Sequence, residues 1–341
     1  MKTQIFKINS PDDEKIKLVG EILREGGLAA IPTETVYGLA GNALDGSCAR
    51  KIFAAKGRPS DNPLIVHISS LSQWNRLVRE IPDSAKALAE AFWPGPLTII
   101  LPKSDLIPDE VSGGLDTVAV RMPENEIARA IIESSGVPLA APSANLSGKP
   151  SPTSAAHVID DMNGRIEAIV DSGDCNVGVE STVITLATSP ARLLRPGQVT
   201  PEMLADVLGE IEIDDAVFDK LLDGKEAASP GMKYKHYSPD APVVLLKGSF
   251  DGFATYVNEN AKEGTVVLCF EGEEKEFGVP CITYGKRNDP SSQAKHIFDA
   301  LRRVDKMGAK QVFARFPENE GMGLAVFNRL LRAAAFNIIE V

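Results

Sequence analysis

The chain has 341 residues, of which 43% are hydrophobic and 24% charged, and its formal net charge is −11. This length exceeds one ordinary compact core and predicts two domains, and the composition is that of a globular protein. The acidic balance argues against general nucleic-acid binding, because a broad binding face for nucleic acid is rich in Lys and Arg.

The four cysteines are far apart, and none forms a CxxC pair. This spacing argues against a zinc ribbon and against a disulfide framework, and it favours a reducing compartment. The first residues lack the apolar run of a signal peptide, and no apolar stretch approaches the roughly 20 residues that cross a bilayer. We therefore expect a cytoplasmic protein without membrane contact.

Apolar runs alternate with helical patterns through the first 210 residues. Residues 12–25 have apolar side chains at helical spacing and end at Gly26-Gly27, and 28–31 then predicts a strand before a polar turn over 32–39. Further strands are expected at 64–68, 97–101, 117–121, 137–141, 168–171 and 182–186, with helices at 83–92, 124–135 and 153–162. This alternation predicts an α/β domain whose sheet is largely covered.

From about Ile211 the chain becomes acidic and rich in small residues, and a proline-bracketed run of aromatic and basic residues follows at 229–239. A plain linker is Gly/Ser-rich or acidic, so we expect this run to lie on another part of the protein. A second, smaller α/β pattern has strands at 243–247, 265–270, 281–284 and 311–316, with helices at 290–307 and 321–335. The predicted division is a domain over 1–210, a linker over 211–241 and a small domain over 242–341.

The loop over 56–63 places Lys56 and Arg58 two residues apart, between glycine and prolines, before a predicted buried strand. Gly57 would allow close approach of a ligand, and the prolines stiffen the loop. A stiff basic loop suits phosphate groups, because Arg offers a planar fork of donors and Lys a mobile point charge. On these residues alone, a solvated surface turn is an equal alternative.

Standard catalytic signatures are absent: the sequence has no Walker loop, dinucleotide fingerprint, G-x-S-x-G elbow or metal-ligand spacing of His. Instead, polar residues gather at the ends of predicted strands, where α/β sheets bind ligands. Each has an ordinary structural explanation, such as a cap or a core histidine, but together they predict a small-molecule site. They are Thr33, Thr35, His67, Thr117, Arg121, Ser143, Asn145, Ser181, Thr182 and Arg195.

Several runs resemble the YrdC-like threonylcarbamoyl-AMP synthases. These are PTETVYGL at 32–39, KGRP at 56–59, WPGPLT at 93–98, VRMP at 120–123, APSAN at 141–145 and ESTV at 180–183. The run at 229–239 and GLAVFNR at 323–329 resemble the long, two-domain form of that family. The motifs follow in the family's order over nearly the whole chain.

The resemblance implies a nucleotidyltransferase that joins L-threonine, bicarbonate or CO2, and ATP into threonylcarbamoyl-AMP and releases pyrophosphate. A threonylcarbamoyl transferase would then use this adenylate to modify adenosine 37 of tRNA. The implied fold is a twisted, mostly covered α/β sheet around a positively charged ligand cavity, with the linker over the cavity and a Rossmann-like α/β C-terminal domain.

The family pattern also implies site residues. Around threonine it implies Thr35, His67, Arg121, Ala141 and Ser181. Around ATP it implies Arg58, Asn62, Thr117, Ser143, Ser151, Arg195 and Tyr234, with Lys56 and Arg58 as the catalytic cations at the phosphates. We expect Mg²⁺ to be held mainly by ATP phosphates and water, because no carboxylate cage is visible in the sequence. No general base presents itself.

Two other functions stay open at this point. The α/β domain could be a module that binds double-stranded RNA, although the net charge does not support direct binding of RNA or tRNA. It could also be a carbamoyl-adenylate enzyme related to hydrogenase maturation, but the long C-terminal segment and the lack of accessory domains argue against this. A purely structural role would leave the strand-end polar residues unexplained.

Overall fold

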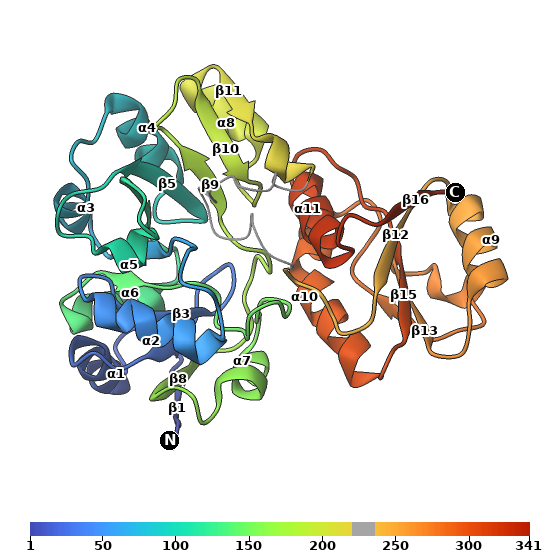
Figure 1. Ribbon diagram of the computed structural model, residues 1–341, viewed down its shortest axis with the longest axis horizontal. Coiled ribbons are helices and arrows are strands. Elements are labelled where there is room, and N and C mark those ends of the chain that lie inside the picture. Colours follow the sequence, from blue (N-terminus) through green and yellow to red (C-terminus); the bar gives the residue numbers. More distant parts are fainter. Residues whose placement is uncertain (220–235) are drawn as a thin grey trace.

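The computed structural model describes residues 1–219 and 236–341, which form two α/β domains (Figure 1). The larger domain is built on a mixed sheet with the strand order β1-β8-β2-β3-β7-β4-β6-β5-β9-β10-β11. Its strands are β1 (Gln4–Lys7), β2 (Ala29–Ile31), β3 (Gly38–Asn42), β4 (Ile65–His67), β5 (Leu97–Pro102), β6 (Thr117–Arg121), β7 (Leu139–Ala140), β8 (Ala168–Asp171), β9 (Thr182–Thr185), β10 (Ala191–Arg195) and β11 (Ile211–Ile213).

Helices cover the sheet on both faces, as the alternating sequence pattern predicts. α1 (Lys15–Arg24) and α6 (Glu126–Ser135) pack together in one apolar cluster. The opposite face is covered by α2 (Gly46–Lys56), α3 (Leu71–Leu77), α4 (Asp83–Phe92), α7 (Ala155–Met162) and α8 (Pro201–Leu208), and the short α5 (Asp109–Ser112) lies against α2.

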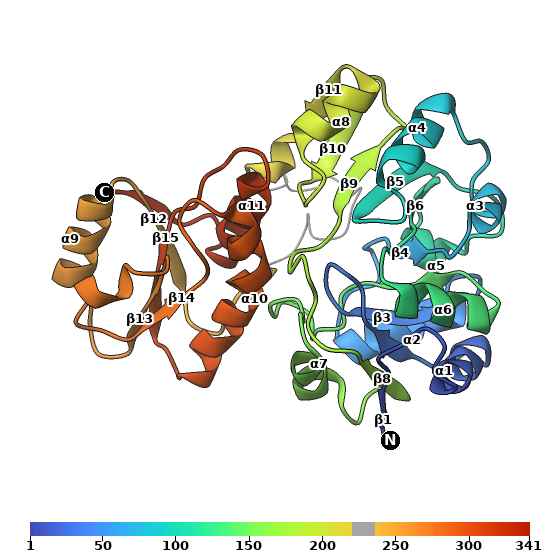
Figure 2. The same cartoon turned by 180° about the vertical axis from the view of Figure 1, so that it is seen from behind.

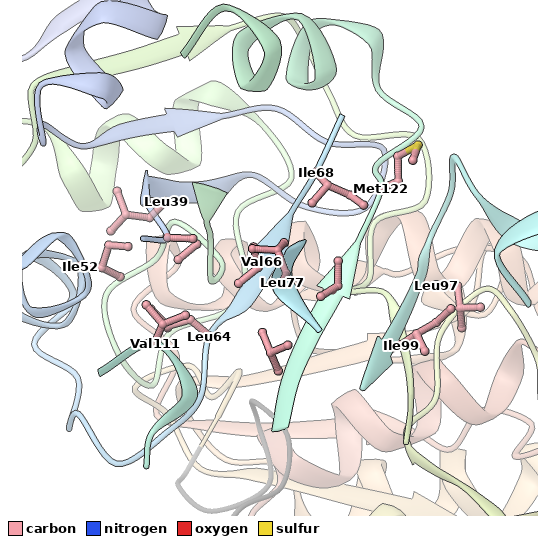
Figure 3. Packing of buried hydrophobic residues seen from close by; sticks show 14 of the residues in the cluster. Leu39, Ile52, Leu64, Val66, Ile68, Leu77, Leu97, Ile99, Val111 and Met122 are labelled. Carbon is pink, nitrogen blue, oxygen red and sulfur yellow. The ribbon is translucent and has the colours of Figure 1, made fainter. Parts of the chain in front are cut away.

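The strand residues of β4 and β6 alternate between the main core and the site. Val66 and Val120 belong to the main hydrophobic cluster, as the close view of that cluster shows for Val66 (Figure 3). Their neighbours Ile65, His67 and Arg121 face the other way, into a cavity described below. The period of two along a strand thus separates packing side chains from site side chains.

α2 ends at the loop that the sequence analysis singled out. Asp45 caps its N-terminus by accepting a hydrogen bond from the Ser47 amide, and Gly57 ends it with a left-handed φ of 62°. A Cβ at Gly57 would meet no atom of the described residues within 4 Å. The left-handed backbone at the helix end by itself favours glycine at this position.

The smaller domain has a parallel sheet with the order β14-β13-β15-β12-β16. Its elements are β12 (Val243–Lys247), α9 (Phe250–Asn260), β13 (Thr265–Cys269), a 3-10 turn at Glu274–Glu276, β14 (Cys281–Thr283), α10 (Pro290–Lys306), β15 (Gln311–Arg315), α11 (Gly323–Ala333) and β16 (Ile338–Glu340). Another 3-10 turn, Asp215–Val217, follows β11 of the large sheet. The predicted α/β fold class is confirmed for both domains.

α10 and α11 lie on the side of the small domain that faces the large one, whereas α9 lies on the far side; both views agree (Figures 1 and 2). Val36, Val177 and Val179 of the large domain belong to the same hydrophobic cluster as residues of α10 and α11. A Cβ at Gly178 would come within 2.4 Å of the α10 backbone. Only glycine allows the loop and the helix to approach so closely.

The predicted linker over 211–241 begins within the large sheet, since β11 pairs with β10. It ends just before β12. Ser238, near this end, donates one hydrogen bond to each domain: its amide to Gly148 O and its hydroxyl to Ala333 O, each at 3.0 Å. Among the residues that the structure describes, no helix has the length and apolar character needed to cross a membrane.

Candidate active site

A cavity lies on the face of β4 and β6 that is turned away from the main core. Its walls come from the loop after β2, the loop after α2, the strands β4, β6 and β10, and the end of the linker. The lining residues are Thr33, Thr35, Val36, Gly38, Arg58, Ile65, His67, Arg121, Ala141, Pro142, Ser143, Glu180, Ser181, Arg195, His236 and Tyr237.

Thr33, predicted from its place after a strand, lines this cavity, and so do eight of the residues that the family pattern implies. Five of them, Thr35, His67, Arg121, Ala141 and Ser181, are the complete set expected around threonine, and the other three are Arg58, Ser143 and Arg195. Four more, Lys56, Asn62, Thr117 and Ser151, are described but are not among the lining residues. Tyr234 lies outside the described residues.

Arg121 stands at the end of β6 and is held by three groups. Its guanidinium donates to Gly95 O at 3.2 Å, to Thr35 Oγ1 at 3.0 Å and to Glu34 Oε1 in a buried ion pair. Burial raises the pKa of Glu34, but Arg121 outweighs this effect and holds the pKa below its usual value. The carboxylate stays ionised and fixes the plane of the guanidinium.

The hydroxyls of Thr33 and Thr35 form a directed chain. Thr33 Oγ1 donates to Val36 O at 2.7 Å, so the 2.8 Å bond between the two hydroxyls uses the proton of Thr35. Because Arg121 also donates to Thr35 Oγ1, this oxygen is fixed at the cavity wall. The loop after β2 is therefore preorganised by its own side chains.

His67 is neutral and oriented. Burial, with Arg121 nearby, lowers its pKa to about 3, so the ring carries no charge near neutral pH. Its Nδ1 lies 3.3 Å from Ile65 O. With the proton on Nδ1, this contact is a hydrogen bond and Nε2 becomes an acceptor.

Arg195 and Ser181 form a second hydrogen-bonded pair in the wall of the cavity. Arg195 donates from Nε to Ser181 O at 2.9 Å and from Nη2 to Ser181 Oγ at 3.1 Å. Ser181 Oγ also lies 2.8 Å from Thr98 Oγ1. Burial lowers the pKa of Arg195 only to about 10, so it remains a cation.

Lys56, predicted to lie at the phosphates, is not among the residues that line the cavity. Its Nζ donates to the carbonyl oxygens of Ser143 and Asn145, and more weakly to Asn145 Oδ1 at 3.4 Å. Burial, with Arg58 close by, places the pKa of Lys56 well below its usual value. In this structure Lys56 lies behind the cavity wall and holds the loop that carries Ser143.

The remaining predicted ATP residues lie around this loop. Ser143 Oγ donates to Asn145 Oδ1 at 2.5 Å, and Ser151 Oγ donates to Glu180 Oε1. Asn62 is fully buried, and neither polar atom of its side chain has a hydrogen-bond partner among the described residues. Such an amide is expected where a ligand supplies the missing partner.

Two residues at the end of the linker line the cavity, although only Tyr234 was named in advance. Burial, with Arg58 nearby, lowers the pKa of His236 to about 3. Tyr237 has a left-handed φ of 61°, and its ring packs at a tilt against that of Phe298 in α10, with the ring centres 5.1 Å apart. The expectation that this aromatic run lies on another part of the protein is confirmed for these two residues.

Sequence reasoning missed the two acidic residues of the site. Glu34 pairs with Arg121, and Glu180 is the one carboxylate among the lining residues that the structure describes. Both stand inside quoted motifs, PTETVYGL and ESTV, so their positions were visible but their partners were not.

The described side chains of the cavity offer few ligands for a metal ion. Glu180 already accepts from Ser151 and Arg329, and the described residues contain no group of three His, Cys, Asp or Glu side chains that could hold a metal ion. These donors do not fit a dedicated metal cage, whereas the cationic side chains of the cavity fit an anionic ligand.

Comparison with known proteins agrees with this site over the whole chain. One family model, described as telomere recombination, matches residues 21–197, and another, described as the C-terminal domain of threonylcarbamoyl-AMP synthase, matches 199–335. A threonylcarbamoyl-AMP synthase of Pyrococcus abyssi is 48% identical over 97% of both chains, and one of Bacillus subtilis is 45% identical over 97% of this chain and 96% of its own.

The fold is also matched by a solved structure. The crystal structure of P. abyssi Sua5 complexed with L-threonine has a TM-score of 0.92 and 46% identity, and the match covers 99% of this chain and all of that one. Both domains, their order and the cavity motifs therefore lead to one conclusion: the chain belongs to the threonylcarbamoyl-AMP synthase family, in its two-domain form.

Proposed function

We propose that this protein makes threonylcarbamoyl-AMP and pyrophosphate from L-threonine, bicarbonate or CO2, and ATP. The observation that carries the proposal is the convergence of three arginines, Arg58, Arg121 and Arg195, with fixed hydroxyls in one cavity of the large domain. A relative of nearly the same length has been solved with L-threonine bound.

Threonine would bind at the Arg121 side of the cavity. A carboxylate calls for a guanidinium whose plane is already fixed, and Glu34 and Gly95 fix that of Arg121. The threonine hydroxyl needs a partner, which the neutral ring of His67 or the hydroxyl of Ser181 would supply. A site that hydrogen-bonds a substrate hydroxyl rejects an analogue that lacks it, because its own buried group is then left without a partner.

ATP would bind toward Arg58, Ser143 and Arg195. The amine of threonine must be neutral to capture CO2, and we infer that positioning and exclusion of water carry this step. The carbamate oxygen would then attack the α-phosphorus in line; the new P–O bond forms as the bond to the bridging oxygen breaks, and pyrophosphate leaves.

The arginines would offset the charge that develops on the phosphate oxygens. We propose that Mg²⁺ enters as part of the nucleotide substrate, held by phosphate oxygens and water, and contributes by neutralising phosphate charge. Lys56, which the sequence analysis placed at the phosphates, would act by holding the Ser143 loop.

We further propose that the adenylate passes to a threonylcarbamoyl transferase that modifies adenosine 37 of tRNA, in the cytoplasm. The linker over 211–241, for which the family pattern implies Tyr234 at the nucleotide, would close the nucleotide side of the cavity, which His236 and Tyr237 line. Neither domain is basic by sequence, so this proposal needs no tRNA binding by the synthase itself.

The test is release of pyrophosphate from ATP, measured with threonine, bicarbonate and ATP together and with each component left out in turn. We expect release only when all three are present, and serine or 2-aminobutyrate in place of threonine serves as the control for side-chain recognition. Equal turnover without threonine would exclude the synthase reaction.

A further inference from the structure

The cavity contains a charge that does not suit its proposed ligand. Glu180 lines a site that would receive the triphosphate of ATP, and a carboxylate there would repel it. Burial acts to raise the pKa of Glu180, but Arg329 and Arg195 hold it below its usual value, so the side chain is ionised. The repulsion must therefore be cancelled by a cation rather than by protonation.

That cation comes from the other domain. Arg329 of α11 is fully buried, and its Nε donates to Glu180 Oε2 at 2.7 Å. The rest of its guanidinium is also committed: Nη1 donates to Pro196 O at 2.9 Å and to Asn328 Oδ1 at 3.0 Å, and Nη2 to Glu180 O at 3.3 Å. The guanidinium thus holds Glu180, in the segment before β9, and Pro196, in the segment after β10.

Glu180 passes this constraint on to the nucleotide side. Its other oxygen, Oε1, accepts from Ser151 Oγ, and its neighbour Ser181 is held by Arg195. The guanidinium of Arg329 also lies 5.7 Å from the ring centre of Tyr237, which lines the cavity at the end of the linker. One side chain of the small domain therefore contacts two separate parts of the wall.

We propose that Arg329 is a positioning residue of the active site, which neutralises Glu180 and so allows the cavity to accept the triphosphate. The small domain is then part of the nucleotide site through α11, in addition to any role of the linker. This inference rests on the proposed use of ATP, and it deepens it by assigning a residue of the C-terminal domain to nucleotide binding.

The proposal predicts an unusual result for a pair of substitutions. Arg329→Met leaves the Glu180 carboxylate buried beside the phosphates without its ion-pair partner, whereas Arg329→Met with Glu180→Gln removes both charges. A structural defect alone would be the same or worse in the double variant. Charge compensation predicts instead that the double variant regains affinity that the single variant loses.

The experiment is ATP·Mg²⁺ binding to the full-length protein by titration calorimetry, without threonine or bicarbonate. We expect Arg329→Met to raise the Kd at least about tenfold and the double variant to recover most of that loss. Arg329→Lys, which keeps the charge but not the fork, should lie between them and serves if the Met variant does not fold. Val312→Ala, in the core of β15, is the control for loss of stability in the same domain.

The outcomes separate the two hypotheses. If the unsubstituted protein does not bind ATP, the proposed function fails. If it binds ATP, and folded Arg329→Met or Arg329→Lys binds as tightly, the role of Arg329 is refuted. An equal loss in Val312→Ala, or a double variant no better than the single one, would likewise overturn the proposal, since either result means that the effect follows from stability.

Discussion

Replacing Lys56 by Met tests whether this lysine acts on the phosphates or holds the loop behind them. Methionine keeps the length of the side chain but removes the bonds to the carbonyl oxygens of Ser143 and Asn145. Hydrogen bonds to a charged group contribute about 1.5–3 kcal/mol each, and relief of the buried charge offsets part of the loss. We expect the free energy of unfolding to fall by about 2–4 kcal/mol.

The kinetic signature separates the two roles. If Lys56 holds the loop, folded Lys56→Met should show a KM for ATP raised roughly tenfold, with kcat changed much less, because Ser143 is displaced before chemistry begins. Urea unfolding and steady-state pyrophosphate release measure both effects. Lys51→Met, at an exposed position of the same helix, is the matched control.

One combination of results would refute this reasoning. A direct phosphate contact predicts that Lys56→Met loses about 10²–10³ in kcat, by comparison with the loss of one preorganised donor, while the free energy of unfolding and KM stay the same. That pattern would return Lys56 to the catalytic role that the sequence analysis gave it.

Three further predictions concern the cavity. Arg121→Ala should raise the KM for threonine and lower the free energy of unfolding by about 3–5 kcal/mol, since Glu34 is left buried without its cation. Threonine titration and urea unfolding measure the two effects, and an unchanged KM for threonine would contradict the prediction. Arg195→Met should lower kcat about 10²-fold in the pyrophosphate assay, and wild-type turnover would exclude its phosphate role. His67 and His236, each with a pKa of about 3 when folded and about 6.5 when unfolded, make the unfolded chain bind more protons between these values. The free energy of unfolding should therefore be highest above about pH 6.5 and fall as the pH is lowered, by up to roughly 1.4 kcal/mol per pH unit for each histidine. Urea unfolding between pH 5 and 7 measures this dependence. A free energy of unfolding that does not change with pH, or that changes equally in His67→Gln, would contradict the prediction.

The strands that the sequence predicted are those rich in branched apolar residues. β5, β6 and β9 begin at their expected first residues and end within about one residue of their expected last ones. They could be predicted because they are buried and their side chains favour strands. β3 was missed, and its sequence GLAGN shows why. With two glycines it has little strand preference of its own, and it forms because β2 and β7 pair with its two edges.

The side chains that line the cavity were largely predictable, but their partners were not. Arg121 and Ser181 could be placed at strand ends by local pattern and by resemblance. The pairs Arg121–Glu34 and Arg329–Glu180 join residues 87 and 149 positions apart, and no local signal links them. The same holds for Lys56, whose acceptors lie in a loop that only the folded sheet brings behind it.

These pairs also explain how an acidic chain builds a cationic cavity. The net charge of −11 gave no measure of the site, where the buried carboxylates Glu34 and Glu180 are each paired with a buried arginine. Glu34 and Glu180 are each neutralised in this way, and Arg58 and Arg195 line the same cavity. Because one of the compensating arginines belongs to α11, the electrostatics of the cavity depend on both domains, and the large domain of this chain carries a charge that it does not balance by itself.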